Sequence, residues 1–332
     1  MSTAGCVSVI IPAYNAAATI DETLRSVRSQ THRTLEILVI DDGSTDETAD
    51  VVCAQAAQDS RIRLVRQENR GVAVARNRGI EEATAELVAF VDADDLWAPE
   101  KIEKQIAALR KGGPSVALVY TWWARIDAAS RVIERYCPTD AGDVLERTCF
   151  GNIVGHCSSA LVTKTAVLEI GGFDPSLRAR RAQGCEDLQF YFRLAERHYF
   201  AIVPEHLTGY RQTSANMSSD LLQMHRSHAL VANEMRRKYP RLESTVALGT
   251  TDFAAWLLER AIDLRRLRLI PVLGAFLVPR NSGLATRILV RRLLRPLARA
   301  LRDVLCARMR GSRPEPAEFP RFLIGNPDLD AS

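Results

Sequence analysis

The chain has 332 residues, enough to bury a full hydrophobic core as one large domain or two smaller ones. Its 44 basic and 40 acidic side chains nearly balance, so the overall charge does not require nucleic acid as a partner. The N-terminus lacks the pattern of a signal peptide, and no apolar run approaches the roughly 20 residues of a membrane-spanning helix. Seven cysteines without a Cys-x-x-Cys pair favour reduced thiols in the cytosol over disulfides or structural zinc. We therefore expect a cytoplasmic protein.

Apolar runs that end in polar loops alternate with helical patterns in the first third of the chain. The runs predict strands at 7–11, 36–40, 61–65 and 87–91. The first helix between them has a single apolar face made by Ile20, Leu24 and Val27. This alternation predicts an α/β fold with a doubly wound, mainly parallel sheet.

Local signals predict where two of the helices begin. Ser44 and Glu47 have the spacing of a capping box for the second helix. Pro99 suits the first turn of the fourth helix, whose buried face we expect to include Ile102 and Ile106.

The loops that follow the four strands carry polar residues, among them Tyr14, Asn15, Asp41, Asp42, Asn69, Asp92, Asp94 and Asp95. Open α/β sheets bind their ligands at the carboxyl ends of the strands, so we expect these loops to line one crevice. The first strand is not followed by Gly-x-Gly-x-x-Gly, which argues against a dinucleotide-binding protein.

Three aspartates, Asp92, Asp94 and Asp95, come directly after the buried strand 87–91. Carboxylates this close repel one another unless a positive charge lies between them, and a divalent cation with oxygen ligands meets that need. The alternative interpretation is a solvated turn, or a cap for the following helix.

The second half of the chain is less regular. It predicts a strand at 158–162, a turn at 171–174 and a helix that opens with Glu186 and Asp187. Acidic side chains at a helix N-terminus are favoured by the helix dipole, so this acidic pair could be no more than a cap. From about residue 221 onward the chain is helical and increasingly basic. We therefore divide it into a ligand-binding domain at 1–220, a helical, arginine-rich region at 221–310 and a loose tail at 311–332.

Six short motifs stand in order along the first domain: VIIPAYN from Val9, IDDGSTD from Ile40, GVAVARN from Gly71, VDADDLW from Val91, GGFD from Gly171 and ED at Glu186. Their order and spacing resemble those of the family 2 glycosyltransferases, over roughly residues 5–215. The resemblance implies a GT-A fold and an inverting transfer from a nucleotide-sugar to an acceptor hydroxyl.

The resemblance also implies roles for individual residues. Pro12, Tyr14 and Asn15 would border the nucleotide, and Asp42 would accept a hydrogen bond from the base amide, most often of uracil. Arg76 would lie near the diphosphate, and Asp92 would hold the ribose or the metal shell. Asp94 would bind Mg²⁺ or Mn²⁺, and Asp187 would be the general base. Successive strand residues point to opposite sides, so only one of Asp41 and Asp42 should face the base. Arg76 could equally be a solvated arginine on a surface helix.

The chemistry of such a transfer fits these roles. Negative charge builds on the departing phosphate oxygens, where a cation held by Asp94 would neutralise it. The acceptor hydroxyl must lose a proton during its attack, which one carboxylate, Asp187, can accept. Many family members carry a histidine two residues after the Tyr-Arg pair, whereas this chain has Thr213, so Thr213 or water would take that place.

Other functions remain open at this stage. A sugar-phosphate nucleotidyltransferase would need a glycine-rich phosphate loop after the first strand, which residues 12–15 do not provide. A non-catalytic nucleotide-sugar sensor or scaffold could keep the same sheet without turnover. The acceptor, a glycan or glycolipid in cell-surface synthesis, is not encoded in any motif.

The C-terminal region interleaves arginines from Arg260 to Arg302 with leucines and has few acids between them. A basic amphipathic helix of this kind can lie on an anionic membrane, which predicts peripheral attachment to the inner face of the membrane. The alternative is that the leucines pack on the first domain and the arginines are merely solvated. No aromatic residues interleave the arginines, which argues against nucleic acid.

Overall fold

The computed structural model describes residues 5–212, 217–290 and 320–322. Its strands are β1 (Val7–Ala13), β2 (Leu35–Asp41), β3 (Ile62–Arg66), β4 (Leu87–Phe90), β5 (Leu96–Trp97), β6 (Val116–Ile126), β7 (Val132–Tyr136), β8 (Ala160–Thr163) and β9 (Tyr199–Arg211). Its α-helices are α1 (Ile20–Arg28), α2 (Thr48–Ala56), α3 (Val72–Glu82), α4 (Lys101–Gly112), α5 (Leu145–Phe150), α6 (Lys164–Glu169), α7 (Ser176–Ala179), α8 (Glu186–Ala195), α9 (Leu221–Lys238), α10 (Glu243–Asp263) and α11 (Ile270–Leu289). Short 3-10 turns lie at η1 (Cys157–Ser159), η2 (Met217–Ser219), η3 (Pro240–Leu242) and η4 (Leu267–Leu269).

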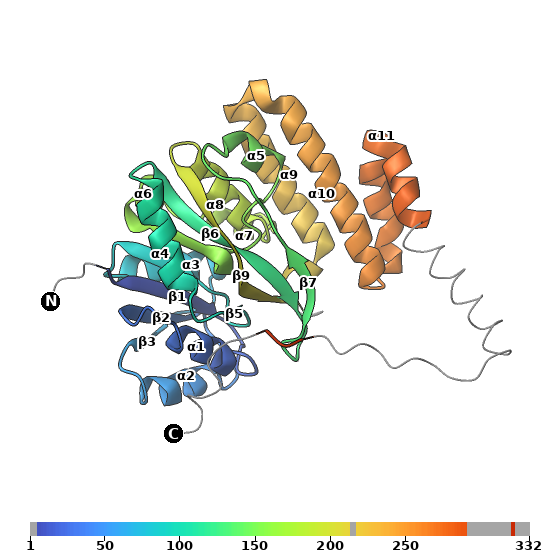
Figure 1. Ribbon diagram of the computed structural model, residues 1–332. Coiled ribbons are helices and arrows are strands. Elements are labelled where there is room, and N and C mark those ends of the chain that lie inside the picture. The colour runs from blue at the N-terminus through green and yellow to red at the C-terminus, as the bar shows by residue number, and fades with distance from the viewer. Residues whose placement is uncertain (1–4, 213–216, 291–319, 323–332) are drawn as a thin grey trace, which may run out of the picture.

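All described strands belong to one sheet with the order β3-β2-β1-β4-β8-β6-β9-β5, and β7 pairs with β6 (Figure 1). The four strands β3, β2, β1 and β4 are parallel, as the alternating pattern predicts. Beyond them β8 is antiparallel to both β4 and β6, while β6 and β9 run parallel to each other. The prediction of a doubly wound α/β fold is confirmed, and the antiparallel insertion of β8 and the long β6 and β7 ribbon were not foreseen.

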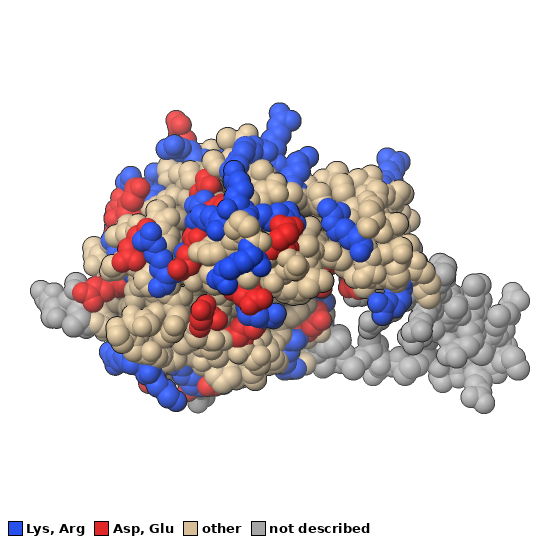
Figure 2. Space-filling model, turned by 90° about the horizontal axis from the view of Figure 1, so that it is seen from above, with Lys and Arg blue, Asp and Glu red and all other residues tan. Residues whose placement is uncertain are grey.

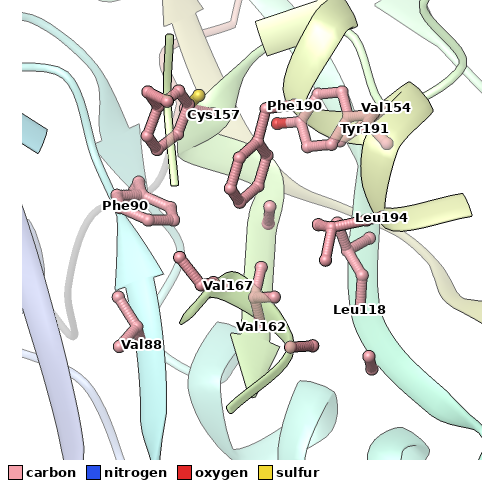
Figure 3. Packing of buried hydrophobic residues seen from close by; sticks show 14 of the residues in the cluster. Val88, Phe90, Leu118, Val154, Cys157, Val162, Val167, Phe190, Tyr191 and Leu194 are labelled. Carbon is pink, nitrogen blue, oxygen red and sulfur yellow. The ribbon is translucent and has the colours of Figure 1, made fainter. Parts of the chain in front are cut away.

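Helices cover both faces of the sheet. On one face, side chains of α8 and α6 pack against β4, β8 and β6, as Phe190, Leu194, Val88, Phe90 and Val162 illustrate (Figure 3). On the other face, the apolar sides of α1 and α4 pack against β1 and β2. This packing fixes the first residues of α8 relative to the carboxyl ends of β1, β2 and β4.

Two predicted helix starts are wrong. The second helix begins at Thr48, whose N–H donates to Asp46 Oδ1 at 3.1 Å, so the expected capping box does not form. Ser44 Oγ accepts instead from the Asn15 N–H at 3.0 Å and ties two loops together. Helix α4 begins at Lys101, two residues after Pro99.

Pro12 lies inside β1 and does not end it. The Ile10 carbonyl accepts from the Val91 N–H on the β4 side of the strand. Because alternate residues of a strand face the same neighbour, Pro12 faces that side too, beyond the last residue of β4. A proline without an N–H is tolerated there because no neighbouring strand awaits a donor.

The described part of the C-terminal region is helical, as predicted. Helices α9, α10 and α11 pack against α8 and α5 through a hydrophobic cluster of their own. The contact between α10 and α5 is close, since a Cβ on Gly249 would meet the Phe150 carbonyl oxygen at 1.8 Å. None of the described helices is long and apolar enough to cross a membrane.

Part of the predicted loose tail packs on the sheet. The Phe322 N–H donates to the Ser130 carbonyl, and the Val132 N–H donates to the Pro320 carbonyl. The Phe322 ring is buried against Leu96, Ala124 and Ile126. Residues 320–322 therefore depart from the expectation for 311–332, and the rest of that segment lies outside the described residues.

Candidate active site

The loops at the carboxyl ends of the first three strands are joined by hydrogen bonds. Asn15 adopts a positive φ of 50° after β1, and its Oδ1 accepts from the Thr45 N–H at 2.8 Å. Asp42 accepts from the backbone N–H groups of Arg70 at 2.9 Å and Gly71 at 2.7 Å. The structure thus brings these predicted loops together at one edge of the sheet.

Asp41 and Asp42 do point to different partners. Asp41 is fully buried, accepts from the Ser44 N–H and pairs with Arg66 at 3.1 Å. Asp42 is 4% exposed and also accepts from Gln67 Nε2 at 2.7 Å. Of the two, Asp42 joins the loops that follow β2 and β3.

The Tyr14 side chain is available to a ligand. It is 53% exposed just beyond the end of β1, which is unusual for so large a ring. Pro12, two residues before it, is buried within β1. Of the three residues expected to border the nucleotide, Tyr14 and Asn15 are exposed, whereas Pro12 is buried in the strand that leads into the loop.

The three aspartates after β4 have different environments. Asp95 is fully buried, and its carboxylate accepts from Ser158 Oγ at 2.5 Å and from the Arg211 N–H at 2.8 Å. Burial, with the charges of Asp94 and Asp92, raises the pKa of Asp95 well above its usual range. Asp95 therefore holds the end of β4 to η1 and to the end of β9.

A divalent cation would find few protein ligands here. The described ranges hold no group of three or more His, Cys, Asp or Glu side chains suited to a metal ion. Asp95 is buried in contacts with the protein and Asp92 pairs with Arg76, whereas the Asp94 side chain is half-buried. Mg²⁺ commonly binds one or two carboxylates together with substrate phosphates and water, so the site fits a cation that arrives with a diphosphate. Thr213 lies outside the described residues.

Arg76 is buried between two carboxylates. It is 4% exposed, its Nη2 lies 2.6 Å from Asp92 Oδ1 and its Nη1 lies 3.6 Å from Glu186 Oε1. Burial alone would lower the pKa of Arg76, but the neighbouring carboxylates raise it well above its usual value. Arg76 is therefore not a solvated surface arginine. It joins the acidic loop, which carries Asp92, Asp94 and Asp95 after β4, to the start of α8.

Asp187 lies in the first turn of α8, partly buried beside this ion pair. Burial, and then the charge of Glu186, raise the pKa of its carboxyl to about 7. Asn152 Nδ2 donates to Asp187 Oδ2 at 2.9 Å, and the Leu188 N–H donates to Oδ1 at 2.7 Å. A carboxylate with this pKa can accept a proton near neutral pH, which a simple helix cap does not require.

Asn152 was missed by sequence reasoning. Its Oδ1 accepts from the N–H groups of Val154 and Gly155, so the loop after α5 holds the amide against Asp187. No motif marks it, because the contact joins residues 35 positions apart. Ser158 was also missed, although an Asn-x-x-Gly turn followed by small polar residues could have indicated a tight, ordered loop.

Four ring side chains form an aromatic cluster beside the acidic loop: Trp123, Tyr136, His156 and Tyr210. Trp123 stacks on Tyr136 with ring centres 3.9 Å apart, and His156 stacks on Tyr210 at 4.7 Å. His156 Nδ1 lies 3.7 Å from Asp95 Oδ2, and burial lowers the pKa of His156 to about 3. The ring is therefore neutral at physiological pH.

Known proteins resemble this chain in both sequence and fold. The family model for Glycosyl transferase family 2 matches residues 8–159. TuaG of Bacillus subtilis (strain 168), a glycosyltransferase provisionally assigned to teichuronic acid biosynthesis, is 30% identical over 233 residues, which cover 70% of this chain and 88% of TuaG. YibD of Escherichia coli (strain K12), an uncharacterized glycosyltransferase, is 46% identical over 103 residues, 31% of this chain and 30% of YibD.

Two solved structures have the same GT-A fold at low sequence identity. Residues 1–349 of S. aureus TarS, in complex with UDP-GlcNAc, align with a TM-score of 0.56 and 16% identity over 84% of this chain and 90% of that one. The mannosyltransferase PcManGT of Pyrobaculum calidifontis, in complex with GDP-Man and Mn²⁺, aligns with a TM-score of 0.55 and 20% identity over 88% and 86%. The motif series, the sheet order and the match to TuaG over most of its length together place this chain in the family 2 glycosyltransferases.

Proposed function

We propose that this glycosyltransferase moves a sugar from a UDP-sugar to an acceptor hydroxyl with inversion, in the synthesis of a cell-surface polysaccharide or glycolipid. The observation that carries the proposal is the continuous network from Asp92 through Arg76 and Glu186 to Asp187. It joins the loop expected to hold the donor phosphates to a carboxylate with the pKa of a general base. TarS, which binds UDP-GlcNAc, supports the choice of nucleotide.

In this mechanism Asp187 takes the proton of the acceptor hydroxyl as that oxygen attacks the anomeric carbon. Asn152 holds the carboxylate in place through Nδ2, so that one oxygen stays oriented toward the acceptor. A single base suffices for inversion, because the attack displaces the nucleoside diphosphate directly. Arg76 would act through its charge, which lies beside Asp92 and would stabilise the negative charge of the donor diphosphate.

The donor would lie across the loops that follow β1, β2 and β4. Tyr14 and Asn15 would border the nucleotide on one side, with Asp42 as the acceptor for the base amide. Asp92 would approach the ribose from its place beside Arg76. Asp94 would hold Mg²⁺ or Mn²⁺, which neutralises charge on the leaving diphosphate when it is bound. PcManGT, solved with Mn²⁺, supports this use of a cation.

A non-catalytic sensor of nucleotide-sugars is the main alternative. Such a protein has no need for a carboxyl with a pKa of about 7 at the acceptor side, and the raised pKa of Asp187 favours an enzyme. A sugar-phosphate nucleotidyltransferase is a weaker candidate, because residues 12–15 after β1 are not a glycine-rich phosphate loop.

The test is a calorimetric screen of nucleotide-sugars with and without Mn²⁺, followed by an assay for released UDP with an acceptor panel. We expect tight binding of one UDP-sugar, and release of UDP together with a product of inverted anomeric configuration. Binding without UDP release on any acceptor would favour the sensor. A retained anomeric configuration would contradict the single-base mechanism.

We also propose that the C-terminal helices attach the enzyme to an anionic membrane. In the segment from Arg265 to the end of α11, exposed arginines (Arg265, Arg266, Arg268, Arg280 and Arg287) alternate with exposed apolar residues (Leu267, Val272 and Val278). Figure 2 shows few acidic atoms on this part of the surface, whereas acidic and basic atoms intermingle over the rest of the visible face. Each basic residue near such a membrane contributes about 1 kcal/mol.

Liposome sedimentation tests this attachment. We expect Arg280→Glu with Arg287→Glu to weaken binding to anionic liposomes severalfold, while the control pair Arg110→Glu with Lys111→Glu at the end of α4 leaves binding unchanged. Equal binding by both variants, or binding that does not depend on salt and anionic lipid content, would contradict the attachment. Helix α11 would then only pack against the other helices.

A further inference from the structure

A buried arginine of the helical region lies beside the aromatic cluster. Arg260, close to the C-terminal end of α10, is 8% exposed, and its Nε and Nη2 atoms donate to no atom of the described chain. Burial lowers the pKa of Arg260, and the other groups that act on it are Tyr210, Arg125, Asp263 and Tyr136. Tyr210 and Tyr136 belong to the aromatic cluster, so the charge of Arg260 acts on the ends of β7 and β9.

A second guanidinium faces the same place from the sheet. Arg125 on β6 pairs with Glu134 at 2.9 Å and donates to Gln212 at 3.1 Å, while its buried Nε has no hydrogen-bond partner within the described ranges. Two nearby cations with unused N–H groups repel each other and are costly to bury. Among side chains of the described part, Asp263 is the acidic group that acts on the pKa of Arg260. Although Glu134 and Asp263 balance the charge, three buried nitrogen atoms, Nε and Nη2 of Arg260 and Nε of Arg125, remain as donors for a further anion.

The aromatic cluster connects this pair to the active site. Tyr210 stacks on His156, which lies 3.7 Å from Asp95 in the acidic loop. Trp123 lies against Gly155, where a Cβ would meet Trp123 Nε1 at 2.5 Å and where φ is +93°. Gly155 in turn belongs to the loop in which Asn152 holds Asp187. Aromatic walls with a few polar groups are typical of small-molecule sites.

We propose that Arg260 and Arg125 bind a negatively charged group of the acceptor, either the carboxylate of an acidic sugar or the phosphate of a carrier. The neutral part of the acceptor would lie against Trp123 and Tyr136, on the way to Asp187. This inference rests on the proposed transferase function, since it names the acceptor class of the same site.

The experiment measures binding of soluble acceptor probes to the full chain by calorimetry at fixed ionic strength. The probes are methyl glucuronide with its neutral match methyl glucoside, and farnesyl diphosphate with its neutral match farnesol. We expect at least one anionic probe to bind tenfold or more tightly than its neutral match. The probe that shows this preference identifies a sugar carboxylate or a carrier phosphate as the source of the anion.

Arg260→Met should abolish the preference and leave UDP affinity unchanged, whereas Arg110→Met, an exposed control on α4, should change neither. The melting temperature should stay level or rise in Arg260→Met, since an unpaired buried cation is removed. Should Arg260→Met fold poorly, Arg125→Met gives the same readout from the sheet side. An undiminished preference in both variants, no preference in the wild type, or a loss of UDP affinity in place of the preference would overturn the proposal. UDP binding by the wild type, measured on the same samples, tests the transferase function separately.

Discussion

Asn152 donates from Nδ2 to Asp187 Oδ2 at 2.9 Å, across 35 positions of sequence. The same amide binds its own loop through Oδ1, which accepts from the N–H groups of Val154 and Gly155. One side chain therefore fixes both the loop and one oxygen of the carboxylate. Such a contact positions a base without touching the reacting atoms.

The first prediction separates these two roles of Asn152. Asn152→Asp keeps an acceptor for Val154 and Gly155 but loses the donor and places a like charge beside Asp187. We expect turnover to fall roughly tenfold or more, and the acidic limb of the rate profile to move to higher pH. Asn152→Ala should lose the loop contacts as well. A rate profile for Asn152→Asp that matches the wild type would show that Asn152 serves only the loop.

Glu186 offers a second test through pH. Its charge raises the pKa of Asp187, whose base form is required, so activity should rise with pH through about 7. Removing that charge lowers the pKa, and Glu186→Gln should therefore shift the acidic limb of kcat/KM to lower pH. The measurement is kcat/KM against pH for both proteins. A limb that stays in place would mean that another group titrates.

Arg76→Met should move the same limb in the opposite direction. The charge of Arg76 lowers the pKa of Asp187, so its loss raises that pKa further. The variant also leaves Asp92 and Glu186 without their buried partner, which typically costs about 3–5 kcal/mol. Denaturant unfolding measures the stability and kcat/KM against pH measures the shift. If the variant is as stable as the wild type and its acidic limb does not move, the proposed role of Arg76 in this network is contradicted.

Asp94 should determine the response to metal. We expect Mn²⁺ to strengthen UDP binding to the wild type, and Asp94→Asn to lose that enhancement while its melting temperature stays unchanged. Exhaustive chelation should stop transfer by the wild type. Full transfer after chelation, or an intact Mn²⁺ effect in Asp94→Asn, would contradict a metal role for Asp94. Calorimetry with UDP, with and without Mn²⁺, gives the answer.

Local patterns predicted the first half of the fold because each parallel strand is a short apolar run that ends in a polar loop. The run from Val7 and the run from Glu36 are both strands that meet side by side. Asp42 and Asp94 come after the ends of two of these runs, which predicted that both lie at the carboxyl edge of the sheet, where the structure has them. Short-range signals were less reliable, as the absent capping box at Ser44 shows, because the Ser44 side chain is engaged by a distant loop.

The second half depends on contacts that no short pattern records. Strand β6 was not predicted although it lies at the centre of that half, between β8 and β9. Arg76 was expected near the donor, yet its partner Glu186 is more than a hundred residues away. The same is true of Asp95, which binds the Arg211 N–H at 2.8 Å. Long-range pairs of this kind follow from the fold and not from local sequence.

The role of Asp187 is the centre of this account, and Asp187→Asn tests it most directly. The variant keeps the size and the hydrogen-bonding position of the side chain but cannot accept the proton. Removing a general base typically lowers the rate by about a hundredfold to ten-thousandfold. We predict a fall of that size in kcat together with an unchanged Kd for the UDP-sugar, measured by steady-state kinetics and calorimetry on the same preparation. A kcat near that of the wild type would contradict the account and reduce the Glu186 and Asp187 pair to a helix cap.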